Sequence, residues 1–427
     1  MLTSDFSRRR LLQAGAAGLA AGLVPGLSNL AFAGAGPERP LLIVVHLRGG
    51  CDGLNLISPA TDPDFIEARA SELRVAADAP DAGHALANGP DPHIDFRLHA
   101  QANGLAELYQ GGHLAFLHAV GLTDGTRSHF VATDMIERGV ADAASLNRLT
   151  DGWLTRALAA DGHAGGLVAA SASGSVSGEL LGLPSAIAVP NLDGGLAPPG
   201  GPQAAEVLKR LYAFAGGDVG SAGREALAAM ATIDGHLGRD AQGHIPPYQP
   251  EAHVDYGPSA EFGRPLRALA QLIKMDVGLQ AATVDLGGWD MHEYQPGRFK
   301  TAVDRLSTGL AEFWNDMVRY HDRMVVVTLT EFGRRLRSNK SQGTDHGRAS
   351  VMAVLGGKVR GGRFYGAWPG MTPDKLDEGV DLAVATDYRR VLTELLEARE
   401  GRRLGAVFPN YAYPGPLGLF GSPPGKA

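Results

Sequence analysis

The stretch "LLIVVHLRGGCDG", residues 41–53, decides the fold. Its first seven residues are an apolar, β-branched-rich run, which is typical of a strand buried on both faces of a sheet. A glycine-rich turn that carries Asp52 follows the run directly. Four more runs of the same character follow along the chain, at residues 114–120, 281–286, 324–329 and 351–357.

Helical patterns lie between these runs. Apolar residues recur at intervals of four and three from Phe299 to Tyr320, which predicts one helix face of about six turns. A second helix is expected from Asp387, in "DYRRVLTELLEARE". Apolar strands separated by helices predict an α/β fold with a mostly parallel central sheet flanked by helices on both faces. We expect residues 34–427 to form a single domain, with Gly/Pro-rich insertions near 162–202 and 236–256.

The N-terminal segment has the pattern of an export signal. "SRRRLL" at 7–12 precedes a weakly apolar Gly/Ala-rich run and "AFA" at 31–33, which predicts a twin-arginine signal peptide over residues 1–33. The run is too short and too weakly apolar for a spanning helix. We therefore expect a periplasmic or cell-surface protein, exported by the twin-arginine route, with no stable membrane span after signal removal.

Composition excludes several classes of protein. The chain has 46 acidic against 39 basic residues, so it lacks the basic footprint of a nucleic-acid-binding protein. Cys51 is the single cysteine, which rules out an internal disulfide. The glycines after the first strand do not form a dinucleotide-binding fingerprint, which argues against an oxidoreductase.

Metal-type side chains gather where the strands end. Ligands of open α/β sheets bind outside the carboxyl ends of the strands, and carboxylates and imidazoles there suit one or two divalent ions, Zn2+, Mn2+, Mg2+ or Ca2+. Either His118 or His129 could be a spare ligand, but His118 is expected to be structural because it is embedded in an apolar run. The candidate ligands are Asp52, Asp290, His292, Glu331, Asp345 and His346.

Ser128 precedes an apparent helix from His129 to Arg138. One interpretation makes Ser128 the N-cap of that helix. The other makes it a nucleophile, because free N–H groups, a positive dipole end and a nearby cation would activate its hydroxyl. Arg127, together with Arg334 and Asn339, would then orient an anionic group.

Six ordered motifs carry a family resemblance: "HLRGGCDGLN", "RSHF", "DGWLTRAL", "GGWDMH", "TEFGRR" and "GTDHG". Together they resemble the exported bacterial family called domain of unknown function 1501. That family is similar to a remote branch of the alkaline phosphatase and sulfatase superfamily. The resemblance implies a central sheet flanked by helices and a site for one or two metals.

The superfamily pattern can be placed on this chain in two registers. One puts Asp345 and His346 on the Asp-His pair that follows a strand, but no histidine then remains for the final ligand. The other makes Glu331 the carboxylate and His346 the final ligand, and it leaves Phe332 where a second imidazole would stand.

The second register implies two unequal sites. Asp290, with Asp285 as a rival, joins His292 and His346 in an open Zn2+ or Mn2+ site, with Asp345 as a fourth ligand or as the partner of a ligating histidine. The other site, of Asp52, Ser128 and Glu331, would be poor in nitrogen ligands and would favour Mg2+, Mn2+ or Ca2+, or no metal.

Two functions are compatible with these residues. The first is a periplasmic metal-dependent hydrolase or transferase of small anionic phosphate or sulfate esters. The alternative is a non-catalytic binding or assembly protein of the cell envelope, which keeps a stabilising metal and binds a protein partner. Phe332 favours the alternative because a phenyl ring cannot ligate a metal.

Overall fold

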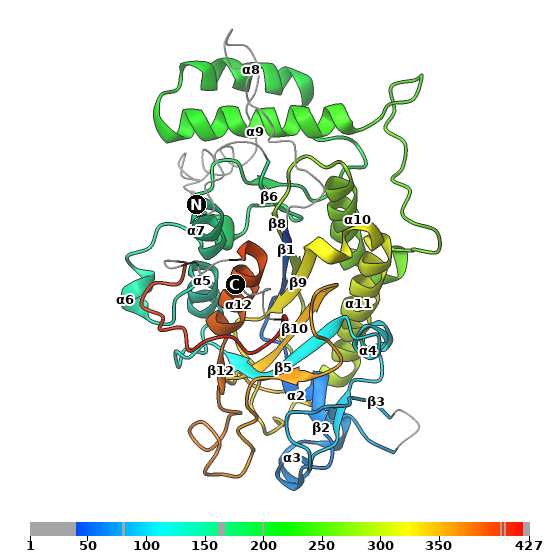
Figure 1. The fold of residues 1–427 in the computed structure, drawn as a ribbon, viewed down its shortest axis with the longest axis vertical. Coiled ribbons are helices and arrows are strands. Elements are labelled where there is room, and N and C mark those ends of the chain that lie inside the picture. The colour runs from blue at the N-terminus through cyan, green and yellow to red at the C-terminus, as the bar shows by residue number, and fades with distance from the viewer. Residues whose placement is uncertain are drawn as a thin grey trace, which may run out of the picture.

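The computed structural model describes residues 40–78, 82–160, 167–198, 200–401, 404 and 407–421 (Figure 1). The predicted signal peptide, residues 1–33, lies outside the described residues. In the described part of the chain, no helix is long and apolar enough to cross a membrane.

A nine-stranded sheet forms the centre of the described chain. Its middle strand is β1 (Leu41–Leu47), which pairs in parallel with β8 (Ala281–Leu286) on one side and with β9 (Met324–Leu329) on the other. All five strands predicted from apolar runs are present, within one residue of their expected bounds. The remaining strands are β5 (Leu114–Gly121), β6 (Ala169–Ser171), β7 (Ile187–Ala188), β10 (Ser350–Gly356), β11 (Phe364–Tyr365) and β12 (Thr386–Asp387).

Strand β10 runs against its neighbours. It is antiparallel to both β9 and β5, whereas the pairs β1–β8, β1–β9, β6–β8, β6–β7, β11–β5 and β12–β5 are parallel. The amino end of β10 therefore lies at the carboxyl end of β9. The loop that joins them, residues 330–349, stays at that carboxyl edge.

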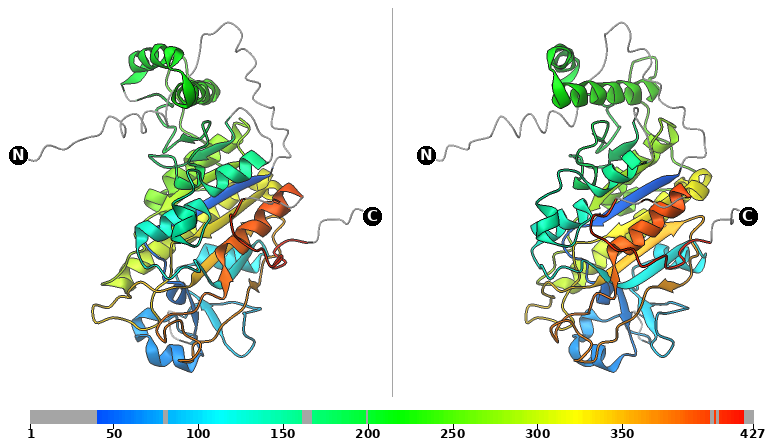
Figure 2. Two further views of the ribbon diagram at one scale, coloured as in Figure 1. Left: turned by 90° about the vertical axis from the view of Figure 1, so that its left-hand side faces the viewer. Right: turned by 60° about the vertical axis from the view of Figure 1, so that its left-hand side comes forward.

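Helices cover both faces of the sheet (Figures 1 and 2). One core contains Ile43 and Val45 of β1, and the other contains Leu42 and Val44, as the alternation of a strand buried on both faces requires. The first face packs on α4 (Asn103–Gln110), α10 (Ala260–Lys274) and α11 (Gln295–Asp316), and the second on α5 (His129–Arg138), α7 (Trp153–Ala160) and α12 (Tyr388–Glu400). The predicted fold class is confirmed.

The predicted helix ends differ slightly from those observed. α11 ends at Asp316, and a 3-10 helix, η4 (Val318–Arg323), continues the apolar face as far as Tyr320. α12 begins after Asp387, whose side chain accepts a hydrogen bond from the backbone N–H of Arg389. Such an N-cap explains why the helix starts there.

Further elements lie around this core. The Gly-rich segment near 162–202 supplies β6, η2 (Gly178–Leu180) and β7, so much of it belongs to the sheet. The helices α8 (Gly201–Phe214) and α9 (Gly217–His236) lie beyond one end of the sheet (Figure 1). A small sheet of β2 (Ile57–Pro59), β4 (Phe96–Leu98) and β3 (His84–Ala85) lies at the other end, with α2 (Gly53–Leu56) and α3 (Pro63–Ala68).

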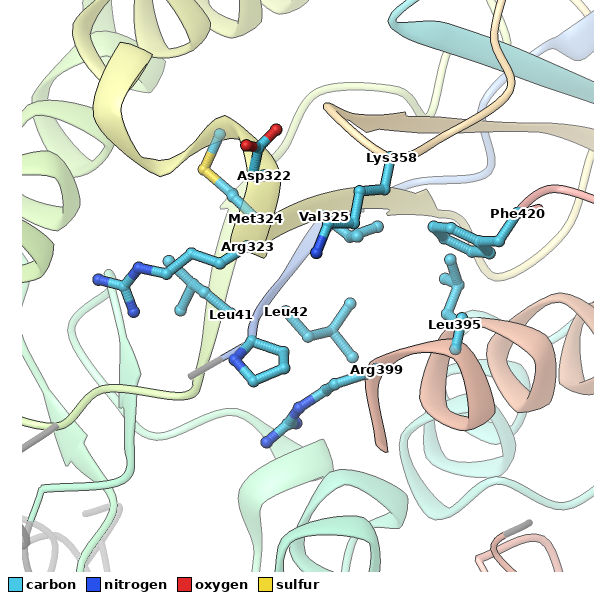
Figure 3. Close-up of a pocket in the computed structure, with 12 residues that line it drawn as sticks. Leu41, Leu42, Asp322, Arg323, Met324, Val325, Lys358, Leu395, Arg399 and Phe420 are labelled. Carbon is cyan, nitrogen blue, oxygen red and sulfur yellow. The ribbon is translucent and has the colours of Figure 1, made fainter. Parts of the chain in front are cut away.

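A pocket opens where β1 and β9 begin, at the end of the sheet opposite to the carboxyl edge. Figure 3 shows apolar side chains of both strands around it, with Leu395, Lys358 and Phe420 on its other sides. The polar residues predicted to ligate a metal do not line this pocket.

Candidate metal centre

Three imidazoles and one carboxylate converge at the carboxyl edge of the sheet. His129 is the first residue of α5, Asp290 and His292 follow β8, and His346 precedes β10. The Nε2 atom of His346 lies 3.0 Å from Nε2 of His129 and 2.9 Å from Nε2 of His292. The Asp290 carboxylate lies 3.3 Å from His346, 3.1 Å from His292 and 3.5 Å from His129, each measured to Nε2.

The other nitrogen of each ring faces an oxygen acceptor. Nδ1 of His129 lies 3.0 Å from a carboxylate oxygen of Glu331, and Nδ1 of His292 lies 3.0 Å from one of Asp345. Nδ1 of His346 lies 2.9 Å from the backbone carbonyl oxygen of Arg127. A neutral imidazole with its proton on Nδ1 keeps a lone pair on Nε2, so the unprotonated nitrogens of His129 and His292 would both face that of His346.

This arrangement fits a divalent cation. Nε2 atoms without protons have no hydrogen to share at 2.9–3.0 Å and repel each other unless a positive charge lies between them. Zinc ligands at about 2.0–2.1 Å in a tetrahedron lie about 3.3 Å from one another, close to the 2.9–3.5 Å separations that involve His346 or Asp290. The set whose ligand atoms all lie within 4.8 Å of one another is His129, Asp290 and His346. Three imidazoles and one carboxylate suit Zn2+ or Mn2+ better than Mg2+ or Ca2+, which prefer oxygen ligands.

Arg334 holds the Asp290 carboxylate by a hydrogen bond. Its Nη2 atom lies 2.7 Å from Asp290 Oδ1, and its guanidinium also donates to the carbonyl oxygens of Gly49, Gly50 and Thr344. Partial burial opposes ionisation of Asp290, but the hydrogen bond and charge of Arg334 outweigh it and hold the pKa of Asp290 below its ordinary value. The Arg334 side chain is buried, and its guanidinium hydrogen-bonds to these protein groups. In this structure it holds Asp290 in place, whereas the sequence predicted that it would orient a substrate.

Glu331 stands behind His129. Its Oε1 atom accepts a hydrogen bond from the backbone N–H of Gly49 at 2.8 Å as well as facing His129. Burial would raise the pKa of Glu331, but backbone N–H groups and His129 stabilise the charged form and lower it. Glu331 was predicted as a metal ligand, and the structure places its carboxylate against Nδ1 of His129.

Asp345 has the same relationship to His292. The sequence left it as a fourth ligand or a histidine partner, and its contact with His292 Nδ1 corresponds to the second alternative. Asn339 donates to the carbonyl oxygen of His292 at 2.8 Å and accepts from the backbone N–H groups of Ser341 and Gly343. Asn339 thus holds the loop that carries Asp345, to whose carboxylate it also donates at 3.2 Å.

The Asp52 carboxylate is buried and hydrogen-bonded to other parts of the fold. Oδ1 accepts from the backbone N–H of Asn55 at 3.2 Å, and Oδ2 accepts from Arg69 and from the side-chain amide of Gln295 at 2.7 Å. The residue is buried, and the guanidinium of Arg69 already neutralises it. These contacts replace the metal-binding role that the sequence suggested for Asp52.

Ser128 lies at the mouth of the cluster. It occupies the N-cap position of α5, but its side chain makes no capping hydrogen bond and is exposed. Arg127, expected to bind an anion, pairs instead with Asp381 and Glu378. Its guanidinium is thereby neutralised, and its carbonyl oxygen holds His346.

Phe332 closes the inner side of the cluster. Its buried ring lies 4.7 Å, between ring centroids, from both His129 and His346. A Cβ atom on Gly50 would come within 2.7 Å of the Phe332 ring, so the space behind the phenyl group is filled. The Phe332 ring thus lies beside His129 and His346, at the position where the superfamily pattern has a second metal-binding imidazole.

His129 was not among the main candidate ligands predicted from the sequence. His129 appeared only as a spare ligand, because it is a single imidazole inside a helix pattern without a neighbouring carboxylate. His118, predicted to be structural, lies buried with Nε2 3.0 Å from the carbonyl oxygen of Ile57, and Nδ1 accepts from the backbone N–H of Ala119. Burial lowers the pKa of His118 to about 4, so it is a neutral core imidazole.

Comparisons with solved structures find only distant likeness. The C-terminal periplasmic domain of EcEptC from Escherichia coli, in complex with Zn, is 8% identical, with a TM-score of 0.35 over 75% of this chain and 73% of that one. The lipoteichoic acid synthase LtaP from Listeria monocytogenes is 9% identical, with a TM-score of 0.30 over 82% and 71%. A protein in the alkaline phosphatase superfamily from Vibrio parahaemolyticus is 9% identical, with a TM-score of 0.34 over 94% and 77%. A search of curated protein sequences found no match.

The family comparison is more direct. Residues 245–398 match the profile described as "Protein of unknown function (DUF1501)". This range holds three of the six motifs that carried the resemblance, "GGWDMH", "TEFGRR" and "GTDHG", and three of the four converging side chains, Asp290, His292 and His346. Residues 245–398 therefore match the DUF1501 family model, the family that the motifs resemble.

Proposed function

We propose that this protein is a metal-dependent hydrolase or transferase that acts on small phosphate or sulfate esters. The observation that carries the proposal is the convergence of three Nε2 atoms on Asp290, with each Nδ1 held by an oxygen. A purely structural metal site needs no access from solvent, but Asp290 is exposed and His292 is partly exposed, and Ser128, which precedes His129 in the chain, is exposed as well. Catalytic zinc sites keep a coordination position for the substrate, so with these four protein ligands the cation would become five-coordinate when an ester binds.

Each residue of the site has a distinct task in this proposal. A divalent cation held by Asp290, His129, His292 and His346 would supply charge stabilisation to the transferring group. Glu331 and Asp345 keep the proton of their histidine partners on Nδ1 and so fix the ligating nitrogen. Arg334 keeps Asp290 ionised and in place.

Ser128 is the proposed nucleophile. Its hydroxyl lies at the amino end of α5, where free backbone N–H groups and the positive end of the helix dipole favour an anion. Attack by the Ser128 oxygen on phosphorus or sulfur would form a Ser128 ester and release the alcohol. Water would then regenerate the serine in a hydrolase, and a second alcohol would do so in a transferase.

Purified full-length protein tests the proposal directly. Turnover of aryl phosphate, phosphodiester and aryl sulfate substrates is measured with Zn2+, Mn2+, Mg2+ or Ca2+ added. We expect activity with one substrate class that requires Zn2+ or Mn2+ and falls by at least 100-fold in Ser128→Ala, while bound metal is unchanged. Ser175→Ala, another exposed serine, is the control. Full activity in Ser128→Ala would remove the serine from the mechanism.

A binding or assembly protein of the cell envelope is the second candidate, and two observations favour it. Phe332 fills the place beside His129 and His346 where a second imidazole was considered. Phe130 and Tyr294, 86% and 68% exposed, follow metal-site residues in the chain and give its surroundings an aromatic surface. No turnover of any ester, combined with a melting temperature that rises on metal addition, would favour this candidate.

The proposal places the protein in the periplasm or at the cell surface, as one domain over residues 34–427, after export through the twin-arginine route. Replacing Arg8 and Arg9 by lysine should keep the protein in the cytoplasm. Cell fractionation with an immunoblot measures this. Export of the double variant at the wild-type level would argue for another route.

A further inference from the structure

A second cluster of metal-type side chains lies on the face of the sheet that α5 and α7 cover, near the carboxyl end of β1. His46 is the sixth residue of β1, Glu137 lies in the last turn of α5, and Glu179 lies in η2. One ligand atom from each lies within 4.8 Å of those from the other two, and Nε2 of His46 contacts Oε1 of Glu179. The side of β1 that carries His46 faces α5 and α7, beside the sheet in Figure 1.

The cluster has more negative than positive charge. Arg48 pairs with Glu137 at 2.7 Å and with Asp285 at 2.9 Å, so one guanidinium faces the carboxylates of Glu137, Asp285 and Glu179. With a neutral His46, two negative charges remain uncompensated. Glu179 is 0% exposed and His46 3%, so water does not solvate this pair, whereas the Asp285 side chain is 39% exposed. Buried charge of this kind is unfavourable unless a cation or a proton balances it.

One oxygen atom in the cluster lacks a donor. Oε2 of Glu179 is buried, and no donor among the described residues binds it. Buried carboxylate oxygens are nearly always paired, because they lose their hydration on folding. The free oxygen belongs to the residue that already contacts His46, and it is therefore available to a ligand at that place.

We infer that His46, Glu137 and Glu179 form a second site for a divalent cation, with a structural role. One imidazole nitrogen and carboxylate oxygens are ligands that Zn2+ and Mn2+ accept. A divalent ion balances the two uncompensated charges, and Oε2 of Glu179 gains a partner. The ion would join β1, α5 and the segment of η2, which are far apart in the sequence.

The two sites are too far apart to form one binuclear centre. His129 and Glu137 are eight residues apart on α5, which corresponds to about 12 Å along a helix. Paired catalytic metals lie about 3.5–4 Å apart. The inner site instead fixes the helix whose first residue is His129, so it supports the carboxyl-edge site without sharing its chemistry.

Metal content in a variant without the carboxyl-edge site tests the inference. His292→Ala/His346→Ala full-length protein is dialysed against Zn2+, then against metal-free buffer, and measured by plasma mass spectrometry. We expect two equivalents of zinc in the wild type, one in this double variant, and none after Glu179→Gln is added. Glu107→Gln, an exposed glutamate on α4, is the matched control and should keep one equivalent.

Crystals of the wild type cover the case in which the Glu179 variant does not fold. Data collected above and below the zinc absorption edge should show an anomalous peak in contact with His46 and Glu179. A double variant without zinc, or crystals without that peak, would overturn the inference. His46 and Glu179 would then be an ion pair, with the balancing charge supplied by a proton on His46.

Discussion

The Nε2 atoms of His292 and His346 lie 2.9 Å apart, while Nδ1 of each ring faces an oxygen acceptor. Two nitrogen lone pairs at this separation destabilise the site when it is empty and strengthen it when a cation is bound. The energetic consequences of this relationship can be measured at several residues around the cluster.

Removal of one imidazole should abolish metal binding at the carboxyl edge. We expect His346→Ala to lose the rise in melting temperature that Zn2+ gives through this site, because His346 contacts each of the other three candidate ligands. At a metal concentration 100 times its dissociation constant, binding stabilises the folded state by about 2.7 kcal/mol. His93→Ala, an exposed histidine elsewhere, should keep the full rise. Scanning calorimetry with and without chelator provides the measurement.

The Glu331 carboxylate, which contacts Nδ1 of His129, should raise the affinity for metal without binding the metal itself. Glu331→Gln keeps the size of the side chain but removes the charge that holds the His129 proton on Nδ1, so we expect metal affinity to fall by about 10- to 100-fold. Competition with a chromophoric chelator gives the dissociation constant. Glu293→Gln, at an exposed residue next to His292, should change it little. Loss of more than 1000-fold would instead mean that Glu331 binds the metal itself.

Gly49 is required by a close backbone approach. It has a φ of +119°, and a Cβ atom there would lie 2.4 Å from the backbone nitrogen of Asp290. Gly49→Ala should therefore displace the loop of Asp290, lower the free energy of unfolding by more than about 2 kcal/mol and weaken metal binding. Gly112→Ala is the matched control, since Gly112 also has a positive φ, +76°, but no atom lies within 4 Å of its Cβ position. Gly112→Ala should lower the free energy of unfolding by only about 1 kcal/mol, which is the cost of a left-handed backbone conformation for alanine. Equal effects of the two substitutions in urea denaturation would show that crowding at Asp290 is unimportant.

Acid should destabilise the protein through His118. Burial lowers the pKa of His118 from 6.5 to about 4, so the unfolded state binds more protons than the folded state between these values. Neutral His118 contributes about 3 kcal/mol to the free energy of unfolding. This contribution is complete above pH 6.5 and is lost as the pH falls through 4. His118→Gln should have a shallower dependence of unfolding free energy on pH in this window, measured in chelator so that metal release does not contribute. A slope identical to that of the wild type would show that His118 does not titrate on unfolding.

The sequence by itself determined the strands, the main helices and the types of side chain that gather at the carboxyl edge. Continuous apolar runs have one stable environment, a strand buried on both faces, and β1, β8 and β9 match them residue for residue. The side chains that follow these strands must reach one edge of the sheet because the strands are parallel. For that reason the pattern of residues alone is enough to predict that Asp290 and His292 lie near Glu331.

Only the tertiary structure decided which of these side chains meet. β10 is antiparallel, and this reversal keeps His346 at the carboxyl edge, where a parallel strand would have taken it to the other end. Asp52 has the same sequence context as a ligand, but Arg69 and Gln295, from distant parts of the chain, bind it first. His129 joins the cluster because α5 packs with its first residue against that edge. Ligand identity depends on where long-range packing aims an atom to within less than about 1 Å, and short-range patterns of residues do not contain that information.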